Sequence, residues 1–386
     1  MLPQQQNSGP HPRSAAAAPP PEPEKLTVLF VSAMDGLGGP VKRLMTLLVH
    51  MTAVRRVLIK PRSDLLDARL RALGCVDEHI SMEKSARRNS RGALALAVRI
   101  FLRAASRRHP VHVIHANGIV EFALSWPAAL ILRKPIVTWV GNYESPAFVK
   151  RFSWLFRPVA SRARWNAVSS TAADVIAECG LARRDFVQVV TNIVDPADVK
   201  PAGDRKSFSD PQRIKIGYLQ VARWEKGFDL LPRVIEELVD IQDQVEFLIY
   251  ATRSNAPGWS ELDDLPPRMV KLRPRTATVG DIYAECDIVF SPSRRESFNR
   301  VVAEAMTSGT PVVASDLEPV RAIVGEAGLL FPVDDVQLAA GCLRRLVKDP
   351  QLRAHLGELG FSRSRAWLPA PVAAEFESQY RSFVRF

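Results

Sequence analysis

The sequence predicts an α/β protein built from two doubly wound parallel sheets, on three observations. Short apolar, β-branched segments alternate with segments of helical periodicity from residue 26 onwards, as in parallel sheets covered by helices. A stretch rich in proline and glycine interrupts this alternation, which then restarts. The chain has 386 residues, 47% of them hydrophobic, so it can bury two cores and is not collagenous, coiled-coil or globally disordered.

The domain boundaries follow the changes in composition along the chain. Residues 1–24 are rich in proline, alanine and glutamine and lack the basic start and apolar stretch of a secretory signal. We therefore expect a disordered tail on a cytoplasmic protein. Rossmann-like domains are expected over 25–195 and 213–365, with a linker over 196–212 between them. Residues 366–386 are expected to form a terminal helix that packs on one or both domains.

Strands are expected where apolar runs are short, and helices where apolar residues recur every three or four positions. Pro40 suits the first turn of a helix, since its fixed φ is already helical. Doubly wound sheets bind ligands at the carboxyl ends of their strands, so we expect the site in the cleft between the domains. The expected strands are 26–32, 54–59, 111–114, 135–140, 214–219, 245–250, 270–272, 288–291 and 311–314. The expected helices are 41–51, 65–73, 118–132, 228–240, 279–285, 301–308 and 335–348.

Several function classes are disfavoured by what the sequence lacks. No stretch of about eighteen apolar residues occurs, so no membrane-spanning helix is expected. Cys75, Cys179, Cys286 and Cys342 are widely separated, without a CxxC pair, which argues against a disulfide framework or a zinc site. No carboxylate cluster for a cation is evident, so we expect neither a metal nor a cofactor requirement. No nucleic-acid-binding signature is found, so nucleic acid is not an expected partner.

The net charge of +11 is concentrated in the first half of the chain. Residues 25–200 hold 27 Lys and Arg against 13 Asp and Glu, whereas residues 201–386 hold 24 against 26. Basic residues alternate with apolar ones over 84–108 and with aromatic ones over 148–165, which suits helices at an anionic membrane surface. We therefore hypothesise peripheral binding to the inner face of the cytoplasmic membrane. The alternative is that both segments pack on the core and expose a solvated basic face.

A glycine-rich turn, residues 36–39, follows the first expected strand. Its backbone amides can approach a phosphate at the start of the next helix. A dinucleotide site would also need a third glycine where Val41 stands, and an acid after the second strand, where Lys60 stands. A nicotinamide-dependent oxidoreductase is therefore disfavoured, and a purely structural tight turn is the alternative to phosphate binding.

Two glutamates mark the richest stretch of the second domain, residues 291–315. With a helix that starts near Asn299, Glu296 lies in the loop before the helix and Glu304 lies within it. Amides at the positive end of this helix suit a diphosphate, and the two carboxylates can accept hydrogen bonds from sugar hydroxyls on either side. The alternative is a pair of surface glutamates beside a capped helix. The amides concerned are those of Phe298, Asn299, Arg300 and Val301.

This stretch resembles the E-x7-E signature of glycosyltransferase family 4, whose members are retaining enzymes with the GT-B fold. Glu296 and Glu304 stand as its two glutamates, and Asn299 stands where the family often has glycine. The resemblance covers roughly residues 26–385. It implies two Rossmann-like domains that face each other across a central cleft, the first for the acceptor and the second for a nucleotide sugar. The flanking segments that also resemble the family are 281–287, 309–315 and 324–331.

The resemblance implies a role for each donor-side residue. Glu296 would bind sugar hydroxyls near the reacting carbon, and Glu304 would bind the nucleotide ribose. Lys226 and Arg223 would neutralise the departing diphosphate, because cations there stabilise charge that grows in the transition state. The family's arginine commonly stands five residues before the lysine, where this chain has Val221. The alternative is that both cations are exposed loop residues. The diphosphate would also face the amides of Phe298, Asn299, Arg300 and Val301 and, across the cleft, Gly38 and Gly39.

The acceptor side centres on His115 and Asn117, which alternation places on one face at a strand end. The resemblance implies that these residues and Asn142 bind the acceptor and that His115 is catalytic. The family's second histidine is here Asn117, and a later one is Trp139. Asn cannot act as a base, so a donor phosphate oxygen is the expected proton acceptor, in a front-face displacement with retention. The alternative is that His115 is a satisfied structural group.

The sequence thus predicts a retaining glycosyltransferase that moves a sugar from a nucleotide-diphosphate sugar to a hydroxyl of a lipid-linked or saccharide acceptor. Assembly of a cell-surface polysaccharide or glycolipid is the expected setting. Three alternatives stay open: glycosylation of a soluble small molecule, a sugar-nucleotide epimerase on the same fold, and a non-catalytic binding protein that retains the fold.

Overall fold

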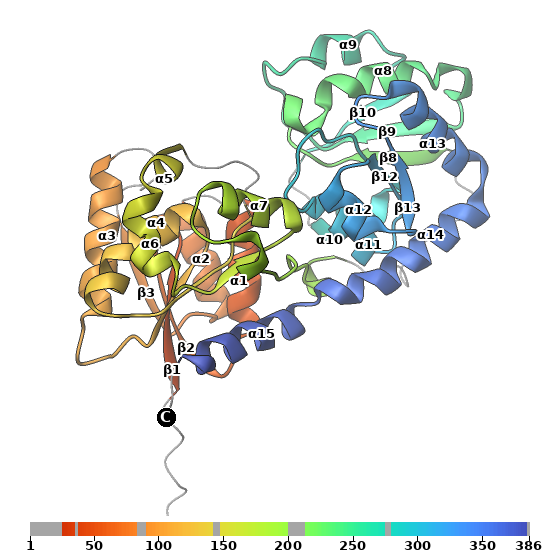
Figure 1. Cartoon of the computed structure of the whole chain (residues 1–386). Helices are drawn as coiled ribbons and strands as arrows, with labels where there is room; N and C mark the ends of the chain where they lie inside the picture. Colours follow the sequence, from red (N-terminus) through yellow and green to blue (C-terminus); the bar gives the residue numbers. More distant parts are fainter. Residues whose placement is uncertain are drawn as a thin grey trace, which may run out of the picture.

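The protein forms two α/β lobes that lie side by side (Figure 1). The predicted tail, residues 200–212 of the predicted linker and Asn142 lie outside the residues described. The computed structural model describes residues 25–34, 38–82, 90–141, 147–199, 213–274 and 279–383.

The first domain is built on a five-stranded parallel sheet in the order β3-β2-β1-β4-β5. Every residue of the central strand β1 is buried, as expected for a parallel sheet covered by helices on both faces. A short parallel pair, β6 and β7, continues from β5 through two bridges. The strands are β1 (Leu26–Val31), β2 (Val54–Pro61), β3 (Glu78–Met82), β4 (Val113–Ala116), β5 (Ile136–Thr138), β6 (Trp165–Ala167) and β7 (Val187–Val189). The helices are α1 (Gly39–His50), α2 (Asp64–Leu73), α3 (Ser90–Ala104), α4 (Ile119–Ile131), α5 (Ala147–Arg151), α6 (Ser153–Ala160) and α7 (Ser170–Glu178).

The second domain is built on a six-stranded parallel sheet in the order β10-β9-β8-β11-β12-β13. β8 and β11 are neighbours although β9 and β10 separate them in sequence, so the loops after β8 and β11 emerge side by side at the carboxyl edge. The strands are β8 (Ile214–Tyr218), β9 (Val245–Ile249), β10 (Val270–Leu272), β11 (Ile288–Ser291), β12 (Val312–Ser315) and β13 (Gly328–Phe331). The helices are α8 (Leu231–Glu236), α9 (Trp259–Asp263), α10 (Val279–Glu285), α11 (Arg300–Thr307), α12 (Glu318–Val324), α13 (Val336–Lys348) and α14 (Pro350–Arg363).

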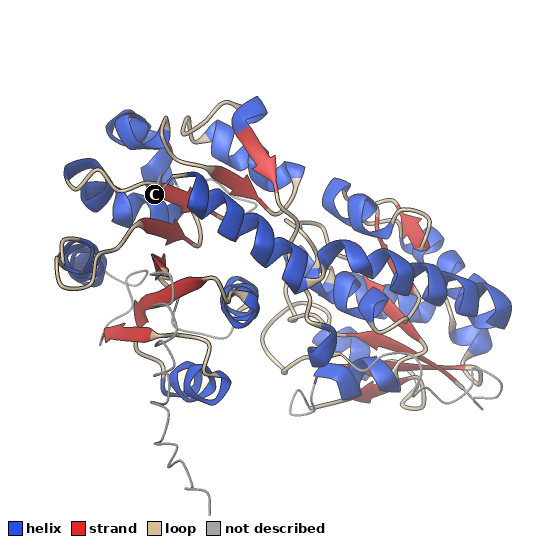
Figure 2. Ribbon diagram, turned by 90° about the horizontal axis from the view of Figure 1, so that it is seen from below, coloured by secondary structure: helices blue, strands red, loops and turns tan. Residues whose placement is uncertain are grey.

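The last helix, α15 (Pro369–Ser382), crosses back to the first domain, where it packs against α1 (Figure 2). Glu377 of α15 accepts a hydrogen bond from the Ala53 backbone amide at 2.9 Å. At the crossing point, the Trp367 indole donates to Thr307 of the second domain at 3.0 Å. The terminal segment therefore links the two domains.

Two predicted helices are broken in the structure. In place of one helix over 228–240, α8 begins at Leu231 and 3-10 turns flank it. Pro232 lies in the first turn of α8, where its missing N–H breaks no helical hydrogen bond, whereas in a helix that began at 228 it would lose the bond to the residue 228 carbonyl. The aromatic and basic segment 148–165 is also not one helix, because α5 and α6 are separated at Phe152 and β6 begins at Trp165.

Four strands carry no clear signal in the sequence. β6 and β7 have three residues each, too few to show a period of two. β3 lies at the edge of its sheet and exposes alternate residues, so no continuous apolar run marks it. β13, also at an edge, is only four residues long and begins with a glycine.

Candidate active site

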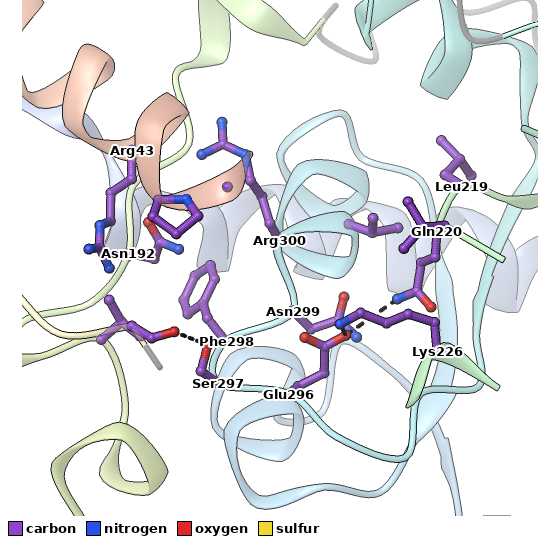
Figure 3. A pocket seen from close by; sticks show the side chains of 16 residues that line it. Arg43, Asn192, Leu219, Gln220, Lys226, Glu296, Ser297, Phe298, Asn299 and Arg300 are labelled. Carbon is purple, nitrogen blue, oxygen red and sulfur yellow. Dashed lines mark hydrogen bonds and ion pairs between the residues drawn. The ribbon is translucent and has the colours of Figure 1, made fainter. Parts of the chain in front are cut away.

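A pocket of about 260 Å³ lies between the two domains (Figure 3). Its first-domain wall includes Arg43 of α1 and Gly141 after β5, and its second-domain wall includes Lys226 and residues 296–301. The Ser297 hydroxyl donates to the Gly141 carbonyl at 2.8 Å, which ties the two walls together. Pockets that hold a whole small ligand usually measure about 300–1,000 Å³. At about 260 Å³, the pocket is smaller than a site for a whole small ligand, so it would take only part of a longer one.

An ion pair between Lys226 and Glu296 lies in the second-domain wall. Lys226 Nζ is 2.7 Å from Glu296 Oε1, and the two side chains are 23% and 9% exposed. Lys226 comes from the turn after β8, and Glu296 comes from the loop after β11. The structure thus brings together the two side chains that the sequence predicts to act on one donor. They offer a cation and a hydrogen-bond acceptor to the same ligand.

Three polar side chains missed by the sequence reasoning extend this pair into a network. Ser293 Oγ lies 2.9 Å from Glu296 Oε1 and 3.1 Å from Gln220 Oε1. Gln220 Nε2 in turn donates to Ser291 Oγ at 2.9 Å. Gln220 and Ser293 follow the adjacent strands β8 and β11, and this position at neighbouring carboxyl ends is the signal that could have identified them.

Arg294 holds together the two loops that carry the ion pair. Its guanidinium makes a bidentate contact with Asp229 at 2.7 and 2.8 Å and donates to the Trp224 carbonyl at 2.8 Å. The hydrogen bonds to Asp229, and then that to Asp334, raise the pKa of Arg294 above its usual range. Gly227 has φ +64°, and a Cβ there would stand 1.9 Å from the Pro292 carbonyl oxygen. Only glycine lets the two loops approach this closely.

The start of α11 is shaped by Asn299, which has φ +67° and caps the helix. Its Oδ1 accepts from the Val302 amide at 3.2 Å, and its Nδ2 donates to Ser291 Oγ at 2.8 Å. Left-handed backbone favours glycine, and Asn is among the few other residues that adopt it readily. The amides of Arg300 and Val301 are left without intrahelical acceptors, as at every helix start. They make this end of the helix suitable for an anion.

Glu304 lies beside the pocket, and its carboxylate is engaged by protein groups. Oε1 is 2.5 Å from Arg300 Nε, and Oε2 accepts from the Tyr283 hydroxyl at 2.9 Å. Burial, followed by the Glu304 charge, holds the pKa of Tyr283 well above its usual range. Burial lowers the pKa of Lys42 on the facing helix α1. The charge of Glu304 opposes this shift, and the charge of Arg300 adds to it. The predicted ribose-binding carboxylate is thus paired within the protein.

Arg43 is a pocket residue that the sequence analysis missed. It is 2% exposed, its guanidinium carbon lies 4.4 Å above the Trp139 ring, and it donates to the Trp139 carbonyl at 2.7 Å. It also donates to Asn117 Oδ1 at 2.9 Å. Burial lowers the pKa of Arg43 to about 9, against the opposing charge of Glu121. The signal that could have identified Arg43 is its position among the apolar residues of the expected helix 41–51.

The prediction that His115 points into the cleft is wrong. Its side chain has no exposed surface, and its Nδ1 lies 2.7 Å from the Tyr380 hydroxyl of α15. Phe30 and Phe376 also pack against its ring. Burial lowers the pKa of His115 to about 3. The terminal helix, far away in sequence, covers the strand face that the local pattern assigns to the acceptor.

The other predicted residues divide between the pocket and its surroundings. Gly39 lines the pocket, whereas the preceding Gly38 caps α1 and does not. Arg223 is exposed and lies outside the lining, so the structure does not pair it with Lys226. Asn117 is 4% exposed and lies outside the pocket lining, where its Oδ1 accepts a hydrogen bond from Arg43. The remaining predicted residues that line the pocket are Phe298, Asn299, Arg300 and Val301.

Comparison with known proteins finds similarity over most of the second domain. Residues 213–349 match the family model described as glycosyl transferases group 1. The D-inositol 3-phosphate glycosyltransferase of Corynebacterium jeikeium is 34% identical over 169 residues, which cover 40% of each chain. The phosphatidyl-myo-inositol mannosyltransferase of Mycolicibacterium smegmatis is 32% identical over 193 residues, which cover 46% of this chain and 49% of that protein. The chain therefore spans about half the length of these curated relatives or less.

The similarity to solved structures extends beyond residues 213–349 and covers nearly the whole chain. Anabaena HepE, solved with UDP and glucose, superposes with a TM-score of 0.74 at 19% identity. The match covers 92% of this chain and 100% of that one. The two-domain architecture is the GT-B fold, which confirms the predicted fold class.

Two further observations concern membrane-spanning helices and metal-binding groups. Within the ranges that the structure describes, no helix combines the length and apolar character needed to cross a bilayer. In those same ranges, no three His, Cys, Asp or Glu side chains are grouped so that they can hold a metal ion.

Proposed function

We propose that the protein is a retaining glycosyltransferase that uses a nucleotide-diphosphate sugar. The observation that carries this proposal is the Lys226–Glu296 ion pair, 2.7 Å long, at the start of α11 in the pocket between the domains. A sugar against Glu296 and a diphosphate against Lys226 and the first amides of α11 would give each of these groups a partner. The family of the second domain supports the same assignment.

The proposed reaction exchanges one bond at the anomeric carbon for another on the same face. The bond from C1 to the diphosphate oxygen breaks, and its electron pair stays on the diphosphate, where Lys226 stabilises the developing charge. The acceptor oxygen forms the new bond to C1, and its proton passes to a diphosphate oxygen. The buried, neutral His115 takes no part in this step. The protein cation and helix amides supply the charge stabilisation, so we propose that no metal is required.

The acceptor is proposed to be a hydroxyl of a lipid-linked polyol or saccharide. Two relatives are named for D-inositol 3-phosphate and phosphatidyl-myo-inositol, and the first domain carries the excess of positive charge. Incubation with labelled donor and a membrane extract should place the label in the organic phase after extraction. Label found only in water-soluble products would favour the glycosylation of a soluble small molecule.

The donor assignment is tested with the purified full chain and a panel of UDP, GDP, ADP and TDP sugars. One nucleotide class should raise the melting temperature, and transfer or hydrolysis of that donor should follow. Glu296→Gln and Lys226→Ala should each lower kcat/KM by roughly 100-fold or more. The exposed residues of the same domain, Glu326→Gln and Lys271→Ala, serve as matched controls and should change it little. A donor altered without an acceptor would instead identify an epimerase, and the absence of any turnover would favour a binding protein.

Peripheral membrane binding is proposed for the surface of α5 and α6. Phe152, Trp154 and Leu155 are 42%, 63% and 38% exposed, beside the exposed cations Arg151 and Arg157. Aromatic rings next to cations suit the interface of an anionic bilayer.

This membrane proposal is tested by flotation with phosphatidylglycerol vesicles at low salt. Wild-type protein should float, and Trp154→Ser should float less. Phe361→Ser, which removes a 43% exposed aromatic from α14 of the second domain, should float like the wild type. Wild-type protein that stays in the soluble fraction would contradict membrane binding without affecting the donor assignment.

A further inference from the structure

The pocket holds three cations, and only some of them can serve a diphosphate. Lys226 already faces the proposed leaving group. Arg43 is 2% exposed, its Nη2 donates to the Trp139 carbonyl and to Asn117, and its guanidinium lies over the Trp139 ring, so these contacts hold it in the first-domain wall. Arg300 is the third cation of the lining, and it is the first residue of α11. A nucleoside diphosphate carries more charge than one ammonium group compensates, so a second cation within reach would bind it more tightly.

The present partners of Arg300 can be exchanged for a diphosphate. Its Nε pairs with Glu304 Oε1 one helical turn away, and its Nη1 donates to the Ile193 carbonyl at a long 3.3 Å. Its side chain is 15% exposed, on the pocket side of the helix end. In Figure 3 the Arg300 guanidinium points away from the Lys226–Glu296 pair. Arg300 is the first residue of α11, so its backbone lies at the helix start where the anion would bind. Rotation about the side-chain bonds of Arg300 would move its guanidinium from Glu304 to the diphosphate.

Glu304 remains compensated when Arg300 leaves it. The Tyr283 hydroxyl still donates to Oε2 at 2.9 Å, and Lys42 of the first domain lies within the field of this carboxylate. The exchange therefore leaves no isolated buried charge, which would be costly. It also frees Oε1, which then becomes available to an incoming hydroxyl.

We propose that Arg300 is the second diphosphate-binding cation of this enzyme and that it exchanges Glu304 for the diphosphate when the donor binds. The freed Glu304 oxygen then accepts a hydrogen bond from the nucleotide ribose. This inference rests on the proposed function and adds to it a cation and an order of events. Donor binding and exposure of the ribose site become one coupled step.

Val221 offers an independent position from which the same charge can be supplied. It lines the same pocket from the loop after β8, and it is 42% exposed. An arginine there can reach the pocket without displacing core residues. It cannot restore the pairing of Arg300 with Glu304, because it comes from a different loop. A rescue by Val221→Arg would therefore report on diphosphate binding and not on the packing of α11.

The test compares the affinities of nucleoside diphosphate and monophosphate, measured by calorimetry with whichever base the donor panel identifies. Arg300→Leu should weaken the diphosphate about tenfold or more while changing the monophosphate much less, and should lower kcat/KM for the donor by about 100-fold. Val221→Arg in the Arg300→Leu background should recover at least tenfold of the lost diphosphate affinity. Arg345→Leu, at an exposed position on α13, is the matched control and should leave both affinities unchanged.

The outcomes separate this inference from the function on which it rests. If Arg300→Leu leaves the ratio of the two affinities within about threefold of wild type, Arg300 is not a diphosphate ligand, whatever its effect on melting temperature. In that case, nucleotide binding that still depends on Lys226 keeps the proposed function intact. If the wild-type chain binds no nucleoside diphosphate at all, the proposed function and this inference both fail.

Discussion

The two walls of the pocket are built in different ways. The second-domain wall presents charged and polar side chains from two adjacent loops, with Lys226 and Glu296 at its centre. Among the residues described, the first-domain wall presents backbone around Gly39 and Gly141 and a buried cation, Arg43, whose Nη2 bonds to its own domain. The contrast teaches that, among the described lining residues, the partly exposed charged side chains are concentrated in the second domain. Four substitutions can break or sharpen this comparison.

The largest effect is expected for Arg43→Met in the first-domain wall. The change removes the guanidinium that compensates the nearby carboxylate of Glu121 and satisfies Asn117. Leaving the Asn117 oxygen or the Trp139 carbonyl without this buried donor costs about 1–3 kcal/mol for each group. Urea unfolding should show this loss, whereas Arg345→Met at an exposed site should stay within about 0.5 kcal/mol of wild type. A stable Arg43→Met protein that has lost transfer would show that Arg43 acts on a ligand, and the contrast between the walls would fail.

The next effect concerns the second-domain wall, where Gly227→Ala should separate the two loops that carry the ion pair. The added Cβ meets the Pro292 carbonyl oxygen, and the backbone there has φ +64°. We expect kcat/KM to fall by about 100-fold, since small displacements of reacting groups have effects of this size. Gly341→Ala in α13 is the matched control, because its Cβ would meet nothing within 4 Å. Full activity of Gly227→Ala would mean that the spacing of the loops is not critical.

A smaller effect is expected where the second wall meets α11. Asn299→Ala loses the cap to Val302 and places alanine at φ +67°, which together should cost about 2 kcal/mol. Asn299→Gly keeps the backbone geometry and should lose only a few tenths of a kcal/mol. Thermal unfolding of both variants measures the difference. Equal melting temperatures would show that the left-handed backbone contributes nothing at this position.

The smallest effect is expected for His115→Phe behind the first-domain wall. Turnover should stay within about threefold of wild type, and loss of the Tyr380 hydrogen bond should cost about 1 kcal/mol at neutral pH. A catalytic role would require turnover to fall far more than stability, which kinetics and urea unfolding together would reveal.

The pH dependence of stability provides a second test of His115. Burial places the pKa of His115 at about 3, below the usual value of about 6.5, so the unfolded chain binds more protons between these two values. The stability that His115 contributes is complete above pH 6.5 and is lost as the pH falls toward 3. The free energy of unfolding of His115→Phe should therefore decline less steeply over this window than that of wild type.

The sequence was informative where interacting residues lie close together along the chain. Residues 291–304 hold most of the second-domain wall, so one local pattern indicates Glu296 and the backbone of Asn299 together. The positions of β8 and β11 followed from their short apolar runs, but their adjacency depends on the crossover, which explains why Gln220 was missed.

The first-domain wall escaped prediction because distant segments assemble it. His115 was assigned to the cleft by alternation along one strand, yet the helix that buries it begins at Pro369. Arg43 was overlooked because only the fold brings it to the Trp139 ring and carbonyl. Local periodicity reports which face of a strand a residue occupies, but it cannot report which distant segment covers that face.

The return of α15 to the first domain sets how the molecule can open. The chain passes between the domains near Val194 and again near Trp367, and a backbone hydrogen bond of 3.2 Å joins these two passages. Rotation about this junction would part Ser297 from Gly141 while leaving both domain cores undisturbed. A ligand too long for the pocket would therefore have to enter by a rotation about this junction, and the two passages would limit the directions in which the domains could separate.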